Sequence, residues 1–170
     1  MAELFLPLTI VMSVLSFSLI SVWYVWPKLR TVQRASALIP LLFLHSFRQI
    51  GLAFLIPGVT TEPLDLRFAN PAAYGDLLAA VLAFVAIIAL RLDWSVAIPL
   101  VWIFNIEGFI DLLNAVFRGF IYTQNGQMGA TYFIPTFIVP ALLVTHVMVF
   151  IILLQGKSFG QRATTGNAVA

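Results

Sequence analysis

The sequence contains no cysteine, and charged residues make up only 9% of its 170 positions. The absence of cysteine excludes disulfide bonds, thiol redox chemistry, cysteine nucleophiles and cysteine-ligated iron–sulfur clusters. A soluble domain usually contains about 25% charged residues, so this chain has too few polar groups to cover a surface in water. The formal net charge of +2 is small and gives no indication of a nucleic-acid partner.

Hydrophobic residues make up 61% of the chain, and they are gathered into long runs of the length that crosses a lipid bilayer. The sequence predicts an all-α integral membrane bundle of five transmembrane helices that form a single domain over residues 1–155. A disordered cytoplasmic tail is expected over 156–170, where the residues are small and polar. The expected helices cover residues 4–26, 36–57, 71–90, 94–116 and 131–154.

Residues that favour turns set these boundaries. Pro27 is expected to end the first helix, and Asn70 to cap the third helix with Pro71 at its first position. Asp93 is in a position to cap the fourth helix, and the polar segment 119–129 is expected to be a loop.

The distribution of lysine and arginine predicts the orientation, because cytoplasmic loops are enriched in both. One side of the predicted bundle has Lys28, Arg30, Arg34, Arg91, Lys157 and Arg162, whereas the other has only Arg67 and Arg118. The N-terminus is therefore expected outside and the C-terminus inside. The location that fits this pattern is a plasma membrane, specifically a bacterial inner membrane.

Ionisable side chains inside a membrane span are costly, at roughly 2.5–3.5 kcal/mol each, so each needs a reason. At about 1.5 Å of rise per residue, Arg48, Asp76 and Glu107 lie at nearly the same depth, roughly 18–21 Å from the inner helix ends. The six candidate site residues are His45, Arg48, Asp76, Glu107, Asp111 and His146.

Helical spacing predicts that these residues converge on one interior cavity in the outer half of the membrane. His45, Arg48 and Gln49 share a face of the second helix, while Glu107 and Asp111 share a face of the fourth. One arginine then faces up to three carboxylates, and a carboxyl group that can be protonated beside an arginine is a candidate proton or cation site. The alternative is a purely structural ion pair between Arg48 and Asp76 or Glu107. Asn105 is expected to point away from this face.

The two histidines are also expected at the same depth in the membrane. His45 and His146 could therefore ligate a haem b axially, or could form a metal site with Glu107, although no Glu-x-x-His spacing occurs. The sequence has no G-x-S-x-G, P-loop or H-E-x-x-H motif, and no lysine within a span that could form a Schiff base.

The segment Phe47–Gly58 contains Arg48, then Gly51-Leu52-x-Phe54, and ends in glycine. It resembles the first helix of DoxX-like bacterial membrane proteins, and the resemblance extends over residues 47–105, with Asp76 where the family has an acidic residue. This resemblance implies a four-helix core and, for some members, a link to quinone-coupled sulfur or thiol redox systems. The chain departs from the family in its extra N-terminal helix, in Asp instead of the usual Glu, and in lacking a lysine after Gly58.

The leading functional expectation is a small membrane protein whose buried polar cavity, lined by the six candidate residues, binds a lipophilic or quinone-like ligand as an accessory of a redox system. A proton-coupled transporter with Glu107 or Asp76 as the titrating group is a second hypothesis. A structural subunit that pairs with other membrane subunits is a third. A membrane isomerase or reductase that uses the carboxylates as general acids stays open.

Overall fold

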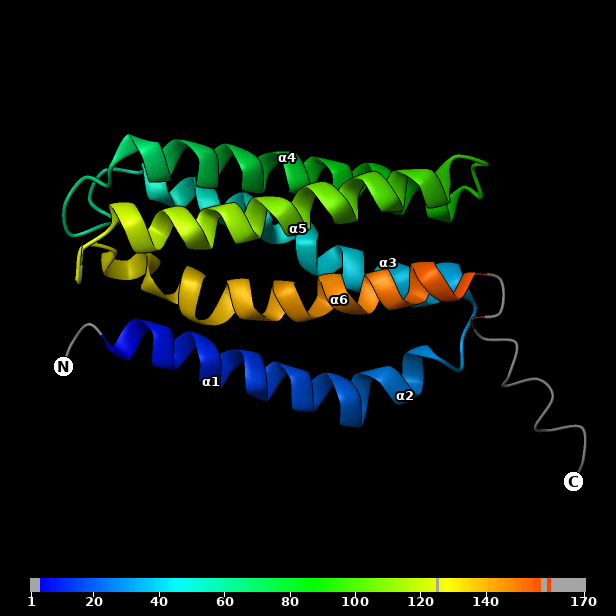
Figure 1. The fold of residues 1–170 in the computed structure, drawn as a ribbon. Helices are drawn as coiled ribbons and strands as arrows, with labels where there is room; N and C mark the ends of the chain where they lie inside the picture. Colours follow the sequence, from blue (N-terminus) through cyan, green and yellow to red (C-terminus); the bar gives the residue numbers. More distant parts are fainter. Residues whose placement is uncertain (1–3, 125, 157–158, 160–170) are drawn as a thin grey trace, which may run out of the picture.

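The computed structural model describes residues 4–124, 126–156 and 159, and within these residues it is entirely helical (Figure 1). Five helical spans run side by side along the molecule, and each is long and apolar enough to cross a membrane. This confirms the predicted number of spans. They cover Phe5–Leu29, Arg34–Leu55, Leu66–Arg91, Ala97–Tyr122 and Gly129–Gln155.

The first span lies at the edge of the bundle rather than inside it. It comprises α1 (Phe5–Ile20), a wider π-helical turn (Ser21–Val25) and α2 (Trp26–Leu29). Pro27 does not end this helix as predicted, because it occupies the first turn of α2, where a missing backbone N–H is tolerated. All of α1 is described and none of its residues is buried; it packs mainly along the last span (Figure 1).

The second span changes its helical geometry at its midpoint. It begins as α3 (Arg34–His45) and continues as the 3-10 helix η3 (Ser46–Leu55), which is long for a helix of this type. Because a 3-10 helix has three residues per turn, its buried face repeats every third residue: Arg48, Gly51 and Phe54. Gln49, expected beside Arg48 on α-helical spacing, is exposed instead.

The third span, α4 (Leu66–Arg91), begins five residues before its predicted start. Pro71 therefore lies inside the helix, and Asn70 is not its cap. A proline inside a helix leaves the carbonyl four residues earlier without its usual donor, and here that carbonyl belongs to Arg67. Arg118 donates to this Arg67 oxygen at 2.9 Å, so a neighbouring helix satisfies the group that Pro71 leaves free.

Asp65 is the cap of α4, since its carboxylate accepts a hydrogen bond of 2.8 Å from the backbone N–H of Arg67. Side-chain hydrogen bonds from Arg67 lower the pKa of Asp65 to about 2, so the cap is charged at neutral pH. We expect Asp65→Ala to lower the melting temperature in detergent by a few degrees and Asp65→Ser to restore it. The difference between wild type and Asp65→Ala should shrink as the pH falls from about 4 towards 2, because the folded-state advantage of the carboxylate is lost there.

The fourth span, α5 (Ala97–Tyr122), begins three residues later and ends six residues later than predicted. The expected loop over 119–129 is thus helical in its first part. Asp93 does not cap α5; it adopts a left-handed backbone conformation (φ 52°) in the preceding turn, and the helix begins after Val96 without a side-chain cap. The last span comprises a 3-10 turn (Gly129–Tyr132), a π-helical turn (Ile134–Ile138) and α6 (Val139–Gln155).

The other four spans form a core around α4, which packs closely against α5 and η3. Its buried face consists largely of alanine, and small side chains let neighbouring membrane helices approach each other. These buried alanines are Ala69, Ala72, Ala73, Ala79, Ala80, Ala83, Ala86 and Ala89.

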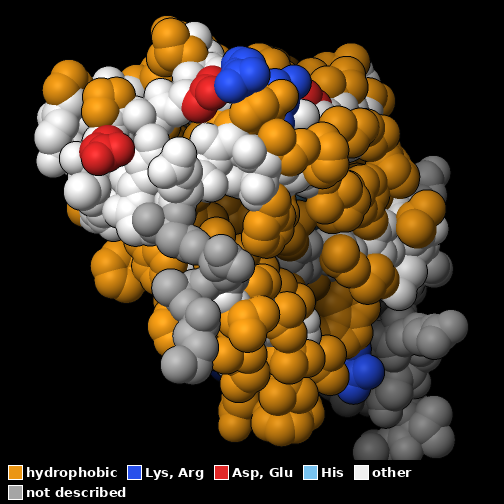
Figure 2. All heavy atoms as spheres, turned by 60° about the vertical axis from the view of Figure 1, so that its left-hand side comes forward, with side chains coloured by type: hydrophobic (Ala, Val, Ile, Leu, Met, Phe, Trp, Pro, Cys, Tyr) orange, Lys and Arg blue, Asp and Glu red, His pale blue; other side chains and the backbone are white. Residues whose placement is uncertain are grey.

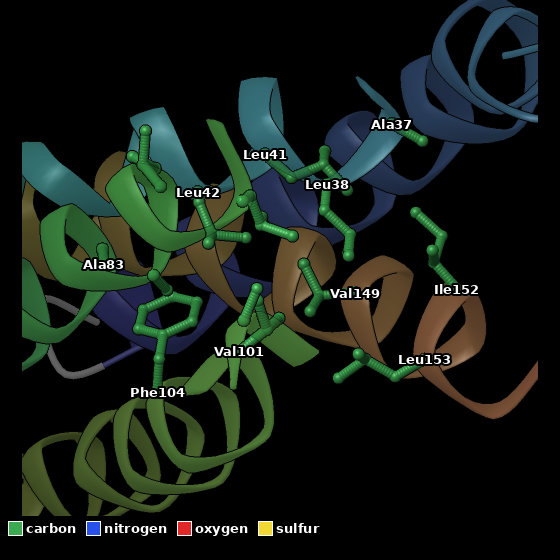
Figure 3. Packing of buried hydrophobic residues seen from close by; sticks show 14 of the residues in the cluster. Ala37, Leu38, Leu41, Leu42, Ala83, Val101, Phe104, Val149, Ile152 and Leu153 are labelled. Carbon is green, nitrogen blue, oxygen red and sulfur yellow. The ribbon is translucent and has the colours of Figure 1, made fainter. Parts of the chain in front are cut away.

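A hydrophobic layer fills the end of the core where α3 begins and α6 ends. Most of its side chains come from α3, α4, α5 and α6 and point toward one another (Figure 3), and Leu29 of α2 and Phe159 also belong to it. Its completely buried members include Leu38, Leu42, Val101, Val149 and Ile152. The buried residues of this layer are all hydrophobic. At its edge, Arg34 Nη2 donates to the carbonyl of Leu153 at 2.8 Å.

The outer surface of the bundle is mainly apolar. Figure 2 shows a face covered largely by hydrophobic side chains, with most of the visible charged side chains gathered toward one edge of the view. The predicted disordered tail lies almost wholly outside the described residues. Phe159, which is described, is buried and packs edge-on against Trp26 with ring centroids 6.0 Å apart.

Candidate functional site

Arg48 lies at the centre of a buried polar cluster that joins three helices. Its Nε donates to Asp76 Oδ1 at 2.7 Å, and its Nη2 donates to Asp111 Oδ2 at 2.6 Å. Its Nη1 donates to the backbone carbonyl of Gly108 at 3.0 Å. The side chain of Arg48 is 0% exposed, so the guanidinium group holds η3, α4 and α5 together through its fixed fork of donors.

His146 of α6 adds a fourth helix to this cluster. Its Nδ1 lies 2.7 Å from the Oδ1 of Asn105, whose Nδ2 donates to the His146 carbonyl at 3.3 Å. Because the amide nitrogen is committed to that carbonyl, Asn105 Oδ1 is an acceptor and His146 Nδ1 has the proton. His146 Nε2 is then an acceptor, and it faces Arg48 Nη1 at 3.5 Å.

His45 lies against His146, with ring centroids 4.1 Å apart. Its Nε2 lies 2.9 Å from the hydroxyl of Thr145, which also lies 3.0 Å from two carbonyl oxygens of its own helix. A hydroxyl has one proton to donate, so Thr145 donates to its own helix and accepts from His45 Nε2. His45 Nδ1 has no hydrogen-bond partner among the described residues, which suits an unprotonated ring nitrogen.

Five of the six predicted site residues are therefore brought together, and Glu107 is the exception. Glu107 is half-buried on α5, and its Oε2 is buried without a hydrogen-bond partner in the described part of the chain. The bonded centre of the cluster has one positive charge, on Arg48, and two carboxylates, Asp76 and Asp111. Acidic groups thus outnumber the buried cation even without Glu107.

Sequence reasoning missed the residues that orient the cluster. Asn105 was expected to point away, yet it fixes the ring of His146. Nothing in the sequence pointed to Thr145 except that it directly precedes His146. Asn105 bonds His146, and Thr145 bonds His45, in each case on a facing helix. Such bonds depend on helix rotation, which residue spacing alone does not determine.

The packing role of three glycines was not predicted, and each makes room for a charged side chain of a neighbouring helix. A Cβ atom at Gly51 would overlap the side chain of Asp76, and one at Gly75 would overlap that of Asp111. A Cβ at Gly108 would lie 2.7 Å from Arg48 Nη1 and 2.9 Å from the His146 ring. Glycine at these positions lets backbone and charged groups approach closely.

The two histidines do not fit a haem. Axial ligands lie on opposite faces of the porphyrin, whereas the rings of His45 and His146 are in direct contact, tilted by 53°. The ring nitrogens also have other partners, Thr145 for one and Asn105 for the other. The described residues contain no group of three histidine or carboxylate side chains that could hold a metal ion, so the His45, His146 and Glu107 metal site is not formed either.

Three hollows lie along the contact between the first span and the other four spans. An inner pocket of about 30 Å³ reaches Asp76, the only polar side chain among the described residues that line it. It adjoins a vestibule of about 420 Å³ at the end of the molecule near the loop after α5, and the two share Leu6, Gly119, Phe120 and Met128. A third hollow, a groove of about 510 Å³, lies between the second half of α1 and the helices α5 and α6, and its lining is almost entirely apolar.

One side of the first span lines all three hollows. The residues that line them follow one another at four-residue intervals: Leu6, Ile10, Val14, Ser18 and Val22. From Leu6 to Val22 this line is about 24 Å long at helical rise. We call the line of hollows between these residues and the facing sides of α5 and the last span the seam. Its length and apolar walls suit an extended hydrocarbon chain.

The sequence matches the family described as Domain of unknown function (DUF8737) over residues 5–154, and the chain belongs to this family. The match covers nearly all of the five helical spans. No curated protein and no solved structure matches the chain.

Proposed function

We propose that the protein is integral to a bacterial-type plasma membrane and binds a lipophilic molecule along the seam. The observation that carries this proposal is that the inner pocket, the vestibule and the groove all lie along one side of the first span. The inner pocket and the groove are lined almost entirely by apolar side chains, and the inner pocket reaches Asp76. Ligand sites are typically concave and mostly apolar, with a few polar groups that orient the ligand.

The surface and the charge distribution support a membrane location. Long side chains of every span are exposed and apolar, which suits contact with lipid tails. At one end of the bundle lie Lys28, Arg30, Arg34 and Arg91, whereas Arg67 and Arg118 lie at the other. Because cytoplasmic loops are enriched in lysine and arginine, this distribution supports an orientation with the start of α1 and the vestibule on the outer side.

Access to the polar cluster is one-sided. The vestibule opens beside Thr123 and Gln124 at the outer end, and the inner pocket lies between it and Asp76. Toward the basic end the hydrophobic layer closes the core, and no buried polar side chain of the described residues leads through it. A protein that receives a ligand from the outer side or from the bilayer is therefore supported better than a proton-coupled transporter, which needs a path to both sides.

The buried polar cluster holds Asp76 in a fixed position at the inner end of this site. Arg48 fixes the position of Asp76, and His146 and Asn105 in turn fix the polar surroundings of Arg48. The bonded network thus presents one carboxylate to the seam in a defined place. From the resemblance to DoxX-like proteins, the proposal also includes an accessory role in a redox system. Identifying the bound molecule would test that role.

The test compares two valine substitutions at similar exposure. Val147 is 47% exposed and lines the groove, whereas Val81 is 50% exposed on α4 and lines none of the three hollows. We expect wild-type protein purified in mild detergent to contain a co-purified lipophilic molecule, identified by native mass spectrometry and solvent extraction. Val147→Trp should reduce its occupancy at least fivefold because the indole fills the groove, and Val81→Trp should leave it unchanged. Equal occupancy in the two variants would contradict the assignment of the seam.

A further inference from the structure

The inner pocket has an acceptor and no side-chain donor. Asp76 is 7% exposed, and its Oδ1 is bonded to Arg48, while its Oδ2 has no hydrogen-bond partner among the described residues. The other described side chains that line the pocket are hydrocarbon or thioether groups, with Phe54, Phe68 and Phe120 among them. A carboxylate in apolar surroundings is poorly solvated, and a ligand that donates to Oδ2 would compensate for the lost contact with water.

Charge favours the same kind of ligand. Arg48 is shared by Asp76 and Asp111, so the bonded cluster has one cation for two carboxylates. No second arginine or lysine of the described residues is salt-bridged to either carboxylate. A positive group entering the pocket would balance the excess, and the faces of the lining phenylalanine rings would also attract it.

We propose that the inner pocket binds the primary ammonium group of a lipophilic amine, which donates to Asp76 Oδ2 while its hydrocarbon chain lies along the seam. This inference rests on the proposed function and specifies its ligand. A volume of about 30 Å³ accepts an ammonium head but not a ring. A quinone offers only acceptors at its polar end and would meet a carboxylate and no donor side chain. The structure therefore favours an amine over the quinone-like ligand that the sequence suggested.

The depth of the site indicates a free amine rather than a lipid headgroup. Asp76 lies ten residues into α4 from Leu66, which is about 15 Å along the helix. An aminophospholipid would have to bring its phosphate into apolar surroundings to place its ammonium there, which is unfavourable.

The experiment compares probes that share one chain and differ in their heads. Full-length protein in a nonionic detergent is titrated at pH 7 with dodecylamine, dodecanol, dodecanoate and a short-chain phosphatidylethanolamine, and affinity is read from saturable shifts in melting temperature. We expect dodecylamine, which is protonated at this pH, to bind at least tenfold more tightly than each of the others. Equal affinities, or a preference for dodecanoate, would overturn the ammonium assignment while leaving the seam in place. A preference for the phospholipid would transfer the site to a headgroup and overturn the free amine.

Two variants tie the preference to the pocket. Asp76→Asn keeps the size of the side chain and an oxygen for Arg48 but removes the charge, so the tenfold preference for dodecylamine should disappear; Asp65→Asn, an exposed carboxylate outside the seam, should keep it. Ile10→Trp would fill the inner pocket from α1, none of whose residues is buried, and it should abolish dodecylamine binding even where Asp76→Asn proves too unstable to purify. If no probe binds wild-type protein and Val147→Trp keeps its native occupant, the proposed function itself fails.

Discussion

Replacing Arg48 with alanine should lower the free energy of unfolding by about 3–5 kcal/mol, the usual cost of removing one partner from a buried ion pair. The guanidinium group is 0% exposed and bonds two carboxylates and a backbone carbonyl, and all three would lose their donor inside the core. In a chain of this size the loss corresponds to a drop in melting temperature of roughly 6–20 °C. Thermal unfolding in detergent, followed by circular dichroism, measures it.

Arg67→Ala is the matched control for this substitution. Arg67 also forms an ion pair, at 2.6 Å with Asp65, but its side chain is 68% exposed. Exposed ion pairs contribute little to stability, so this variant should melt close to the wild type. If Arg48→Ala and Arg67→Ala melted at the same temperature, the central role of Arg48 in holding the helices together would be wrong.

Adding one methyl group at Gly108 should destabilise the protein by roughly 2–3 kcal/mol, a large effect for so small a change. The new Cβ would lie 2.7 Å from Arg48 Nη1 and 2.9 Å from the ring of His146, and neither side chain is free to move. Arg48 is bonded to Asp76, and His146 is held by Asn105. The methyl group would therefore break bonds in the cluster rather than push aside a flexible side chain.

Gly119→Ala on the same helix separates this clash from the general effect of alanine. There the new Cβ would meet only the Phe68 ring, at 3.5 Å, which is an ordinary van der Waals contact. Glycine inside a helix is about 1 kcal/mol less favourable than alanine, so this variant should melt at or above the wild-type temperature. A Gly108→Ala variant that behaved in the same way would show that the cluster can rearrange.

The sequence was sufficient for the number of spans because each is a run of apolar residues long enough to cross a bilayer. The predicted start of α4 was wrong because the expectation that proline occupies the first turn of a helix considers that helix in isolation. Pro71 is accommodated by Arg118 of α5, which donates to the Arg67 carbonyl, and a bond between residues so far apart in the sequence leaves no local signal. The position of α1 at the edge was equally hidden, since an apolar helix faces lipid as readily as a core.

The candidate site was predictable in outline because charges inside a span are rare enough to stand out. Its details depend on helix geometry and rotation. The 3-10 form of η3 aligns Arg48 with Gly51 instead of Gln49, and the rotation of α5 turns Asn105 toward the core while leaving Glu107 unbonded to it. Neither feature follows from counting residues at an α-helical period.

The arrangement of α1 sets an order of events during synthesis. Of the five described spans, the first to be synthesised contains α1, which packs against α6 of the last span and against the π-helical turn that precedes α6. In the membrane location proposed above, α1 would stay in the bilayer without its partner until the chain beyond Gly129 has been inserted. Among the five described spans the seam would then close last, and a hydrophobic molecule already in the membrane would be enclosed as the fifth span docks.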